Sequence, residues 1–186
     1  MIDRKELVTR HNPKMTKFEP LTPLSVGNGD FAFAVDLTGL QTFPEIYEKG
    51  MPLCTQSSWG WHSYTTPDEL IGQQLRLAQY DTFGRKVGYH TDKTGQEELF
   101  NWLRINPHRF HMGQIGLEFK LSDGSIAQPT DLHNCIQTLD LWTGIITSRF
   151  TVEEIPVTVT TACHPYCDML LVSVDSKLIE LGRLVV

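Results

Sequence analysis

The residues best suited to bind a ligand lie together in one short stretch, "SSWGWHSY", from Ser57 to Tyr64. It holds two tryptophans, a histidine and a tyrosine, separated by small residues: Trp59, Trp61, His62 and Tyr64. Flat aromatic faces can stack on the C–H faces of sugar rings, and a histidine can hydrogen-bond a hydroxyl group. Two interpretations stay open. The stretch faces a sugar or another domain, or its tryptophans pack a long loop onto the fold.

A second candidate is the turn "VGNGD", from Val26 to Asp30. Its glycines permit positive φ, and Asn28 tolerates it. A dinucleotide-binding fingerprint is excluded, because the third glycine and the following helix are absent. The turn either joins two strands, or it also places Asn28 or Asp30 at the edge of a binding site.

Two short motifs have spacings that resemble metal sites. "CHPYC" places Cys163 and Cys167 around His164, and "HRFH" places His108 and His111 three positions apart. Structural zinc needs four ligands in recognisable clusters, and the cysteine motif continues a strand pattern. We therefore expect buried thiols and loop histidines, with no metal and no cofactor. The four cysteines are expected to be mostly reduced, as in a cytoplasmic protein.

The carboxylates do not form an obvious catalytic pair. Glycoside hydrolysis needs a proton donor and a base or nucleophile on either side of the scissile bond. Neighbours such as Glu97 and Glu98 would point in different directions on a helix. Neither a Gly-x-Ser-x-Gly elbow nor a Cys/His nucleophile pattern is found. The sequence assigns no catalytic residue.

Charge and hydropathy exclude several classes of partner. The net charge is −6 and the basic residues are scattered, which argues against nucleic acid and anionic membranes. No stretch approaches the roughly 20 apolar residues that cross a bilayer. The polar start, "MIDRKELVTRHNP", has no apolar signal-peptide region, so a cytoplasmic location is expected.

Strand patterns dominate the elements that must position these residues. Apolar residues alternate over residues 30–37 and 115–121, in two runs over 137–163, and over 169–176. Asp123-Gly124 is a hairpin signal and Glu153-Glu154 a polar turn. We predict an all-β fold, an antiparallel β-supersandwich. The predicted core contains Phe31, Phe33, Val35, Ile115, Leu117, Phe119, Leu141, Trp142, Ile145, Phe150, Val157, Val159, Leu171 and Val174.

Two short helices are predicted within long loops. One begins at Pro67, with acidic residues in its first turn, and the other covers "TGQEELFNWLRIN", residues 94–106. Between Phe43 and His111 the chain is otherwise irregular and aromatic. So long an irregular segment is unusual in a compact sandwich, which indicates a functional or interdomain surface.

These segments occur in an order that resembles one known family. "PLSVGNGDFAFAVDLTGLQTF", "CTQSSWGWHS", "HMGQIGLEFKLSDGS" and "LDLWTGIITSRFTVEEIPVTVTTACHP" resemble the N-terminal β-sandwich of six-hairpin glycosidase-like proteins. These are bacterial glycoside hydrolases related to inverting sugar phosphorylases and α-L-fucosidases, built on an (α/α)6 barrel. The resemblance runs from about His11 to Lys177.

The resemblance implies that residues 1–186 are a single N-terminal domain, a truncated part of a larger chain. In that family the catalytic carboxylates lie on the helical barrel, so no catalytic residue is carried over and this chain alone is expected to be inactive. The sandwich would pack on the barrel and lend a loop to the rim of its active site. The side-chain chemistry of the segment from Trp59 to Tyr64, and not the family, makes it our candidate for that loop. One alternative is a stand-alone carbohydrate-binding module using Trp59, Trp61 and Tyr64. Another is a structural domain that forms homodimers through unpaired strand edges.

Overall fold

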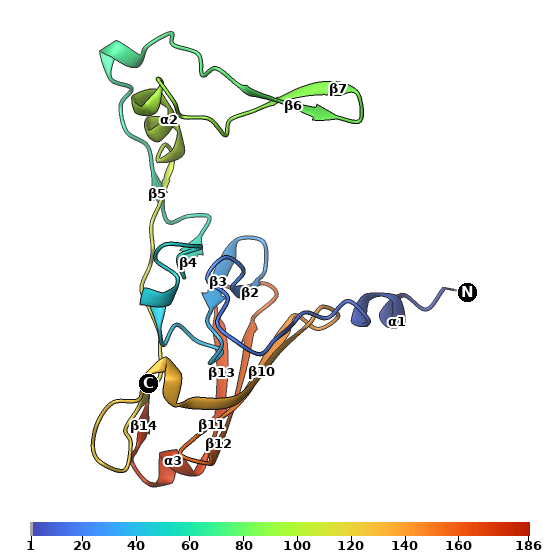
Figure 1. Cartoon of the computed structure of the whole chain (residues 1–186), viewed down its shortest axis with the longest axis vertical. Helices are drawn as coiled ribbons and strands as arrows, with labels where there is room; N and C mark the ends of the chain where they lie inside the picture. Colours follow the sequence, from blue (N-terminus) through green and yellow to red (C-terminus); the bar gives the residue numbers. More distant parts are fainter. Residues whose placement is uncertain (1) are drawn as a thin grey trace. The chain divides into compact units, whose positions relative to one another are not determined.

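A computed structural model describes residues 2–186, which fall into two compact units. The larger unit contains residues 2–57 and 111–186, and the smaller unit contains residues 58–110. Strands greatly outnumber the short helices, and all strand pairs are antiparallel, so the predicted all-β fold class is confirmed (Figure 1). Among the described residues no helix is both long and apolar enough to span a membrane.

The larger unit is built on a five-stranded antiparallel sheet in the order β1-β10-β11-β12-β13 (Figure 1). Its strands are β1 (Lys14–Met15), β10 (Leu132–Asp140), β11 (Ile145–Val152), β12 (Ile155–Cys163) and β13 (Leu170–Asp175). β-branched residues at alternate positions favour this pleated arrangement. As the sequence predicts, β11 and β12 are joined by the two-residue turn Glu153-Glu154.

Smaller sheets accompany the five-stranded one. β2 (Leu24–Gly27), β3 (Phe31–Val35) and β4 (Thr55–Ser57) form one, and β9 (Glu118–Phe119) pairs with β14 (Leu184–Val185). The helical elements of this unit are short: α1 (Arg4–Thr9), α3 (Lys177–Glu180) and the 3-10 turns η1 (Pro44–Ile46) and η3 (Pro129–Asp131). Helices this short depend on tertiary contacts for their stability.

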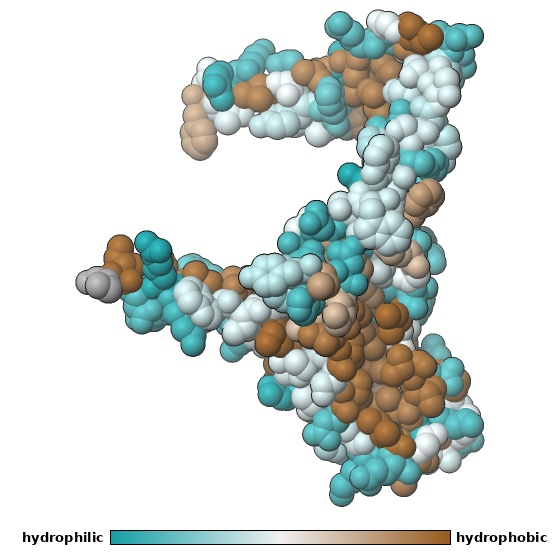
Figure 2. Space-filling model, turned by 180° about the vertical axis from the view of Figure 1, so that it is seen from behind, coloured by the Kyte–Doolittle hydropathy of each residue, from teal (hydrophilic) through white to brown (hydrophobic). Residues whose placement is uncertain are grey.

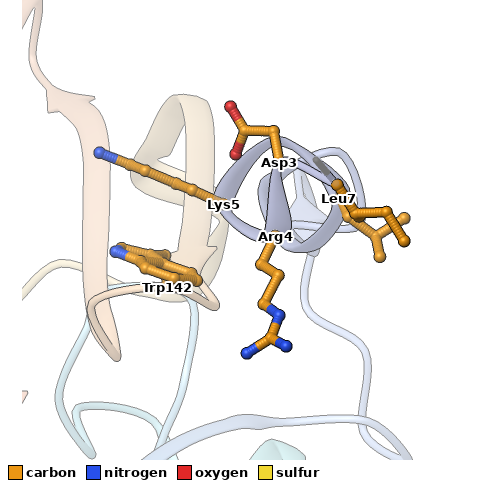
Figure 3. A pocket seen from close by; sticks show the side chains of 6 residues that line it. Asp3, Arg4, Lys5, Leu7 and Trp142 are labelled. Carbon is orange, nitrogen blue, oxygen red and sulfur yellow. The ribbon is translucent and has the colours of Figure 1, made fainter.

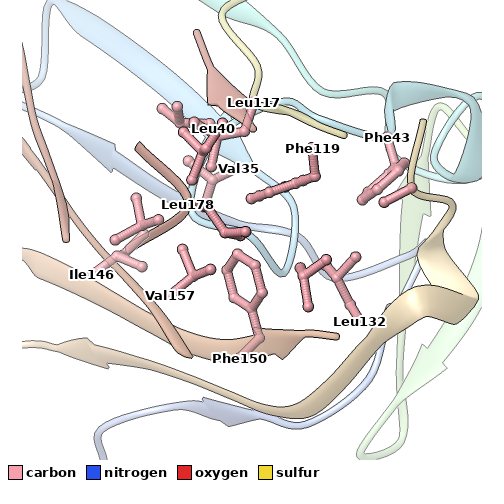
Figure 4. Close-up of a cluster of buried hydrophobic side chains, with 14 of the residues drawn as sticks. Val35, Leu40, Phe43, Leu117, Phe119, Leu132, Ile146, Phe150, Val157 and Leu178 are labelled. Carbon is pink, nitrogen blue, oxygen red and sulfur yellow. The ribbon is translucent and has the colours of Figure 1, made fainter. Parts of the chain in front are cut away.

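The hydrophobic core gathers side chains from both β-layers and from α3 (Figure 4). Phe119 and Phe150 meet edge to face, with ring centres 5.6 Å apart. Alternation along β11 buries Ile146, Phe150 and Val152 on one face. The predicted core residues that are buried are Phe31, Phe33, Val35, Leu117, Phe119, Phe150, Val157 and Val159, while Val174 packs against the core partly buried.

The core prediction is wrong at Ile115, Leu141, Trp142 and Leu171, which are all exposed. Leu141 and Trp142 lie in the turn between β10 and β11, outside the pleat that buries alternate residues. Leu171 points away from the core because its strand neighbours Leu170 and Val174 occupy the inner face. The alternation that includes Ile115 forms a strand only at β9.

A buried polar loop connects the two β-layers. The carboxylate of Asp36, just after β3, accepts hydrogen bonds from Thr38 N (2.7 Å), Thr38 Oγ1 (2.6 Å) and Phe43 N (2.7 Å). Asp36 and Thr38 are fully buried. Burial raises the pKa of Asp36 from 3.8 to about 6, although these hydrogen bonds act in the opposite direction.

The same loop is hydrogen-bonded to the five-stranded sheet. Gln137 Nε2 donates to the carbonyl of Asp36 (2.6 Å), and Thr161 Oγ1 donates to the carbonyl of Gly39 (2.6 Å). Gly39 has φ +90, and a Cβ there would lie 3.0 Å from Ser148 Oγ. Glycine at this position therefore lets the loop lie directly against the sheet.

The smaller unit contains two separate strand pairs and one helix. Its elements are β5 (Trp61–His62), η2 (Asp68–Leu70), β6 (Ala78–Thr82), β7 (Arg85–Tyr89), α2 (Glu97–Arg104) and β8 (His108–Arg109). β5 pairs with β8, and β6 with β7. The predicted second helix is present as α2. The helix expected from Pro67 is only the 3-10 turn η2, because Ile71 is extended and Gly72 has φ +78.

The first prediction concerns the buried carboxylate. Asp36→Asn places an amide N–H₂ group opposite the donor Phe43 N or the two donors of Thr38, so at least one buried donor loses its acceptor. We expect a loss of about 2 kcal/mol in the free energy of unfolding at pH 7, measured by urea denaturation. Because the folded-state pKa of Asp36 is raised, its contribution is full below pH 4 and is lost as the pH rises through about 6.

Between pH 4 and 7 the wild type should therefore lose about 2 kcal/mol of stability that Asp36→Asn, which cannot titrate there, does not lose. The comparison of the two proteins at each pH cancels the titration of the other carboxyl groups. This account of the loop would be contradicted if Asp36→Asn were as stable as wild type at pH 7. It would also be contradicted if the difference in unfolding free energy between the two proteins grew as the pH rises.

The second prediction concerns the turn between β11 and β12. Glu153 and Glu154 both have positive φ, 46° and 65°, which is costly for residues with a Cβ. Glu154→Gly should raise the free energy of unfolding by about 1 kcal/mol, measured by urea denaturation. Glu153→Gly is the comparison, because it relieves the same strain but removes the hydrogen bonds that Glu153 accepts from Ser122. Glu153→Gly also removes the ion pair with Arg183, so equal gains from both substitutions would show that these side-chain interactions of Glu153 together contribute nothing.

Candidate functional site

The candidate site is a two-stranded ladder formed by β5 and β8 in the smaller unit. Its register places Trp61 opposite Arg109 and His62 opposite His108. Because side chains alternate along a strand, the ladder has two faces. We call them the histidine face, with His62 and His108, and the tryptophan face, with Trp61 and Arg109.

Aromatic rings pack on one another at the histidine face. His62 stacks on Phe110, with ring centres 4.9 Å apart and planes at 17°. It meets Tyr64 at 4.4 Å and His108 at 5.3 Å, both edge to face. Tyr64 is also fixed by its backbone, because its N–H donates to Asn106 Oδ1 (3.1 Å). These ring contacts stabilise the ladder, although Tyr64 (47%) and Phe110 (42%) remain partly exposed.

Three ring nitrogens in the smaller unit are buried without a hydrogen-bond partner among the residues described: His62 Nδ1, His108 Nδ1 and Trp102 Nε1. A buried polar atom of this kind costs about 1–3 kcal/mol when its partner is missing. The two histidine nitrogens belong to the packed face and are not accessible to solvent.

The tryptophan face is open. Trp61 is 48% exposed, and the guanidinium carbon of Arg109 lies over its ring, 6.0 Å from the centre. Arg109 Nη1 donates to the carbonyl of Ser58 (3.1 Å). The preceding turn is ordered, since Phe110 N donates to Gly60 O (2.8 Å). An aromatic side chain that stays half exposed on a hydrogen-bonded ladder is a preformed surface for stacking.

The structure brings most of the predicted site residues together. Trp61, His62 and Tyr64 lie in or beside the ladder, and Trp59, which is 66% exposed, accepts a hydrogen bond from Trp61 N at its carbonyl (3.0 Å). His62 lies on the histidine face, so its side chain cannot contact a ligand that is bound at the tryptophan face. Asn28 belongs to the larger unit.

Asn28 fixes a turn. Its Nδ2 donates to the carbonyls of His164 (3.2 Å) and Cys167 (3.1 Å), and its Oδ1 accepts from Asp30 N (3.0 Å) and Phe31 N (2.8 Å). These four bonds use the ordinary hydrogen-bonding capacity of an asparagine side chain. Asn28 therefore ties the turn between β2 and β3 to the loop after β12.

Sequence analysis missed Arg109 and Phe110 as members of the site. His108 was noted for its spacing from His111, but His111 lies in the larger unit, where its Nδ1 accepts from Thr55 N (3.1 Å). The available signal was an aromatic stretch at each end of one irregular segment, residues 59–64 and 108–111. No group of three or more metal-binding side chains is found in residues 2–186.

The larger unit has two hollows that could also receive a ligand. One, of about 750 Å³, lies between α1 and Trp142, where Lys5 extends alongside the indole (Figure 3). The other, of about 430 Å³, is lined in part by Ala32 and Ala34 of β3. The first hollow rests on a helix with no buried residue, and the second has a mainly apolar lining that includes Leu21 and Met51. The first hollow also brings an indole, Trp142, beside a cation, Lys5, whereas in the ladder strand register and a hydrogen bond to the Ser58 carbonyl hold the cation in place.

The third prediction separates a structural from a binding role for Asn28. Asn28→Ala removes four hydrogen bonds and should lower the free energy of unfolding by about 2–4 kcal/mol, measured by urea denaturation. Asn28→Asp is the second variant: it keeps the two accepted bonds but places a carboxylate oxygen against the carbonyls of His164 and Cys167, so it should also be less stable than wild type. A stable Asn28→Ala protein would contradict the structural role.

A scan against protein-family models and searches of curated proteins and of solved structures found no match. Function is therefore inferred from the side chains described above. The ladder of the smaller unit carries the chemistry most suited to a ligand.

Proposed function

We propose that this chain is the accessory, carbohydrate-facing domain of a glycoside hydrolase or phosphorylase, as its resemblance to six-hairpin glycosidase-like proteins implies. The all-β antiparallel fold is consistent with that family's N-terminal sandwich. Its ladder would contribute to a sugar-binding surface, and its larger unit would pack against a helical catalytic domain.

The observation that carries the sugar-binding part is the exposure of Trp61 on an ordered ladder. A half-exposed indole leaves apolar surface in water that a ligand can cover. Its orientation is set by strand pairing and by the packed histidine face behind it, so little conformational entropy is lost on binding. A pyranose ring offers the flat C–H surface that such an indole can cover.

The packing of the larger unit supports the accessory role. Leu170, Val172 and Val174 share one side of β13, yet Val172 remains 39% exposed. Hydrophobic residues also gather on one side of this unit (Figure 2), and Met169 and Val185 are about half exposed. Exposed apolar surface of this kind fits a companion domain.

No carboxyl group is assigned a catalytic role. Asp36 has a raised pKa, but its carboxylate is enclosed by the hydrogen bonds of its own loop and is fully buried. A group without access to a substrate cannot donate a proton to it. In the proposed role, acid–base chemistry belongs to the helical catalytic domain, and this chain should not turn over aryl glycosides.

A stand-alone carbohydrate-binding module is the second candidate, and the same exposure of Trp61 favours it. The two roles differ in what the larger unit does. A module should remain monomeric at all concentrations and bind oligosaccharides by itself. An accessory domain should associate through its apolar side, either with a catalytic domain or with itself, which mass measurements over a concentration series would detect.

The fourth prediction tests the sugar-binding surface. Trp61→Ala should reduce affinity for the best-bound oligosaccharide in a panel at least tenfold, measured by isothermal titration calorimetry, because the stacking surface is removed. Phe83→Ala is the control, since Phe83 is fully exposed at the tip of the β6-β7 hairpin in the same unit. If no oligosaccharide binds the wild type, or if Phe83→Ala weakens binding as much, the proposal fails.

A further inference from the structure

The tryptophan face combines an aromatic ring with a permanent positive charge. Arg109 is exposed, and its guanidinium lies over the ring of the half-exposed Trp61. The ion pairs found in residues 2–186 are Lys17 with Glu19 and Arg183 with Glu153. Within that range, Arg109 therefore has no carboxylate partner.

The position of this charge is set by the backbone. Strand register places Arg109 opposite Trp61, and the bond from Nη1 to the carbonyl of Ser58 orients the guanidinium. A guanidinium has five N–H donors and no acceptor, so most of its donors remain for a ligand. Its planar fork matches the two oxygens of a carboxylate or sulfate, to which charge-assisted hydrogen bonds are strong.

The charge balance of the smaller unit does not oppose an anionic ligand. Residues 58–110 contain six acidic and six basic side chains, so the net charge of −6 arises in the rest of the chain. Among the basic residues, Arg109 combines an exposed guanidinium with a position in the ladder. A negatively charged ligand would thus meet a local positive charge within a neutral unit.

We infer that the tryptophan face binds an acidic saccharide, one whose sugar rings carry a carboxylate or sulfate group. The sugar ring covers the part of the Trp61 indole that Arg109 leaves open, and the anionic group pairs with the guanidinium beside it. This inference rests on the proposed carbohydrate-binding function and narrows its ligand class.

The fifth prediction uses matched ligands and matched variants. The probes are short oligomers of galacturonate, guluronate and glucuronate, each with its neutral methyl ester, and a sulfated galactan fragment with its desulfated form. At least one acidic probe should bind wild type at least tenfold more tightly than its neutral counterpart, by isothermal titration calorimetry. The preference should weaken as salt increases.

Arg109→Gln should abolish the preference for the acidic probe while keeping the affinity for its neutral counterpart, and Arg109→Lys should restore part of the preference. Trp61→Ala should weaken binding of both members of the pair. Arg104→Gln is the matched control, because Arg104 also lies over an aromatic ring of the same unit, Phe100 at 5.7 Å, but outside the ladder. Thermal denaturation of each variant reports whether it is folded.

The outcomes separate the two proposals. Binding of neutral and acidic probes with equal affinity, or an acidic preference that survives in a folded Arg109→Gln protein, overturns the inference and leaves the carbohydrate function intact. Failure of every saccharide to bind overturns both. If a poly-glutamate peptide binds as tightly as the best acidic saccharide, the face recognises an acidic protein segment, and the inference is overturned in that way.

Discussion

The larger unit depends on a loop of buried polar groups between its two β-layers. The carboxylate of Asp36 satisfies backbone and hydroxyl donors of the loop, while Gln137 and Thr161 bind the loop's carbonyls from the facing sheet. Apolar burial supplies most of the stabilisation, but it is not directional and would tolerate sliding of the layers. The hydrogen bonds are directional, and losing one leaves a buried group unsatisfied, so they fix a single relative position.

The strands of the larger unit were predictable because alternation and turn chemistry act over short distances. Residues 145–163 follow a period of two, and the Glu153-Glu154 turn was identified from its polarity. Burial was less predictable, because the alternation of buried and exposed side chains holds only within a strand and says nothing of an apolar residue beyond its end. Trp142 illustrates this, since hydrophobicity alone suggested a core residue and its place in a turn exposes it.

Only some residues of the candidate site could be predicted from the sequence. Composition identified the tryptophans and Tyr64, since clustered aromatic residues among small ones are visible in one stretch. Pairing β5 with β8 joins positions about fifty residues apart, and no local pattern encodes that register. Register assigns Arg109 to the face of Trp61 and His62 to the opposite, packed face. Asn28, chosen for its place between glycines, bonds instead within its own unit.

The chain leaves the larger unit and returns to it at adjacent points. Met112 N donates to the carbonyl of Thr55 (2.9 Å), so the two ends of the smaller unit start from neighbouring backbone positions. The entropy of closing such an excursion grows only with the logarithm of its length. Evolution, or an engineer, could therefore shorten, lengthen or exchange residues 58–110 while the sandwich stays the same, so that ligand choice varies independently of the scaffold.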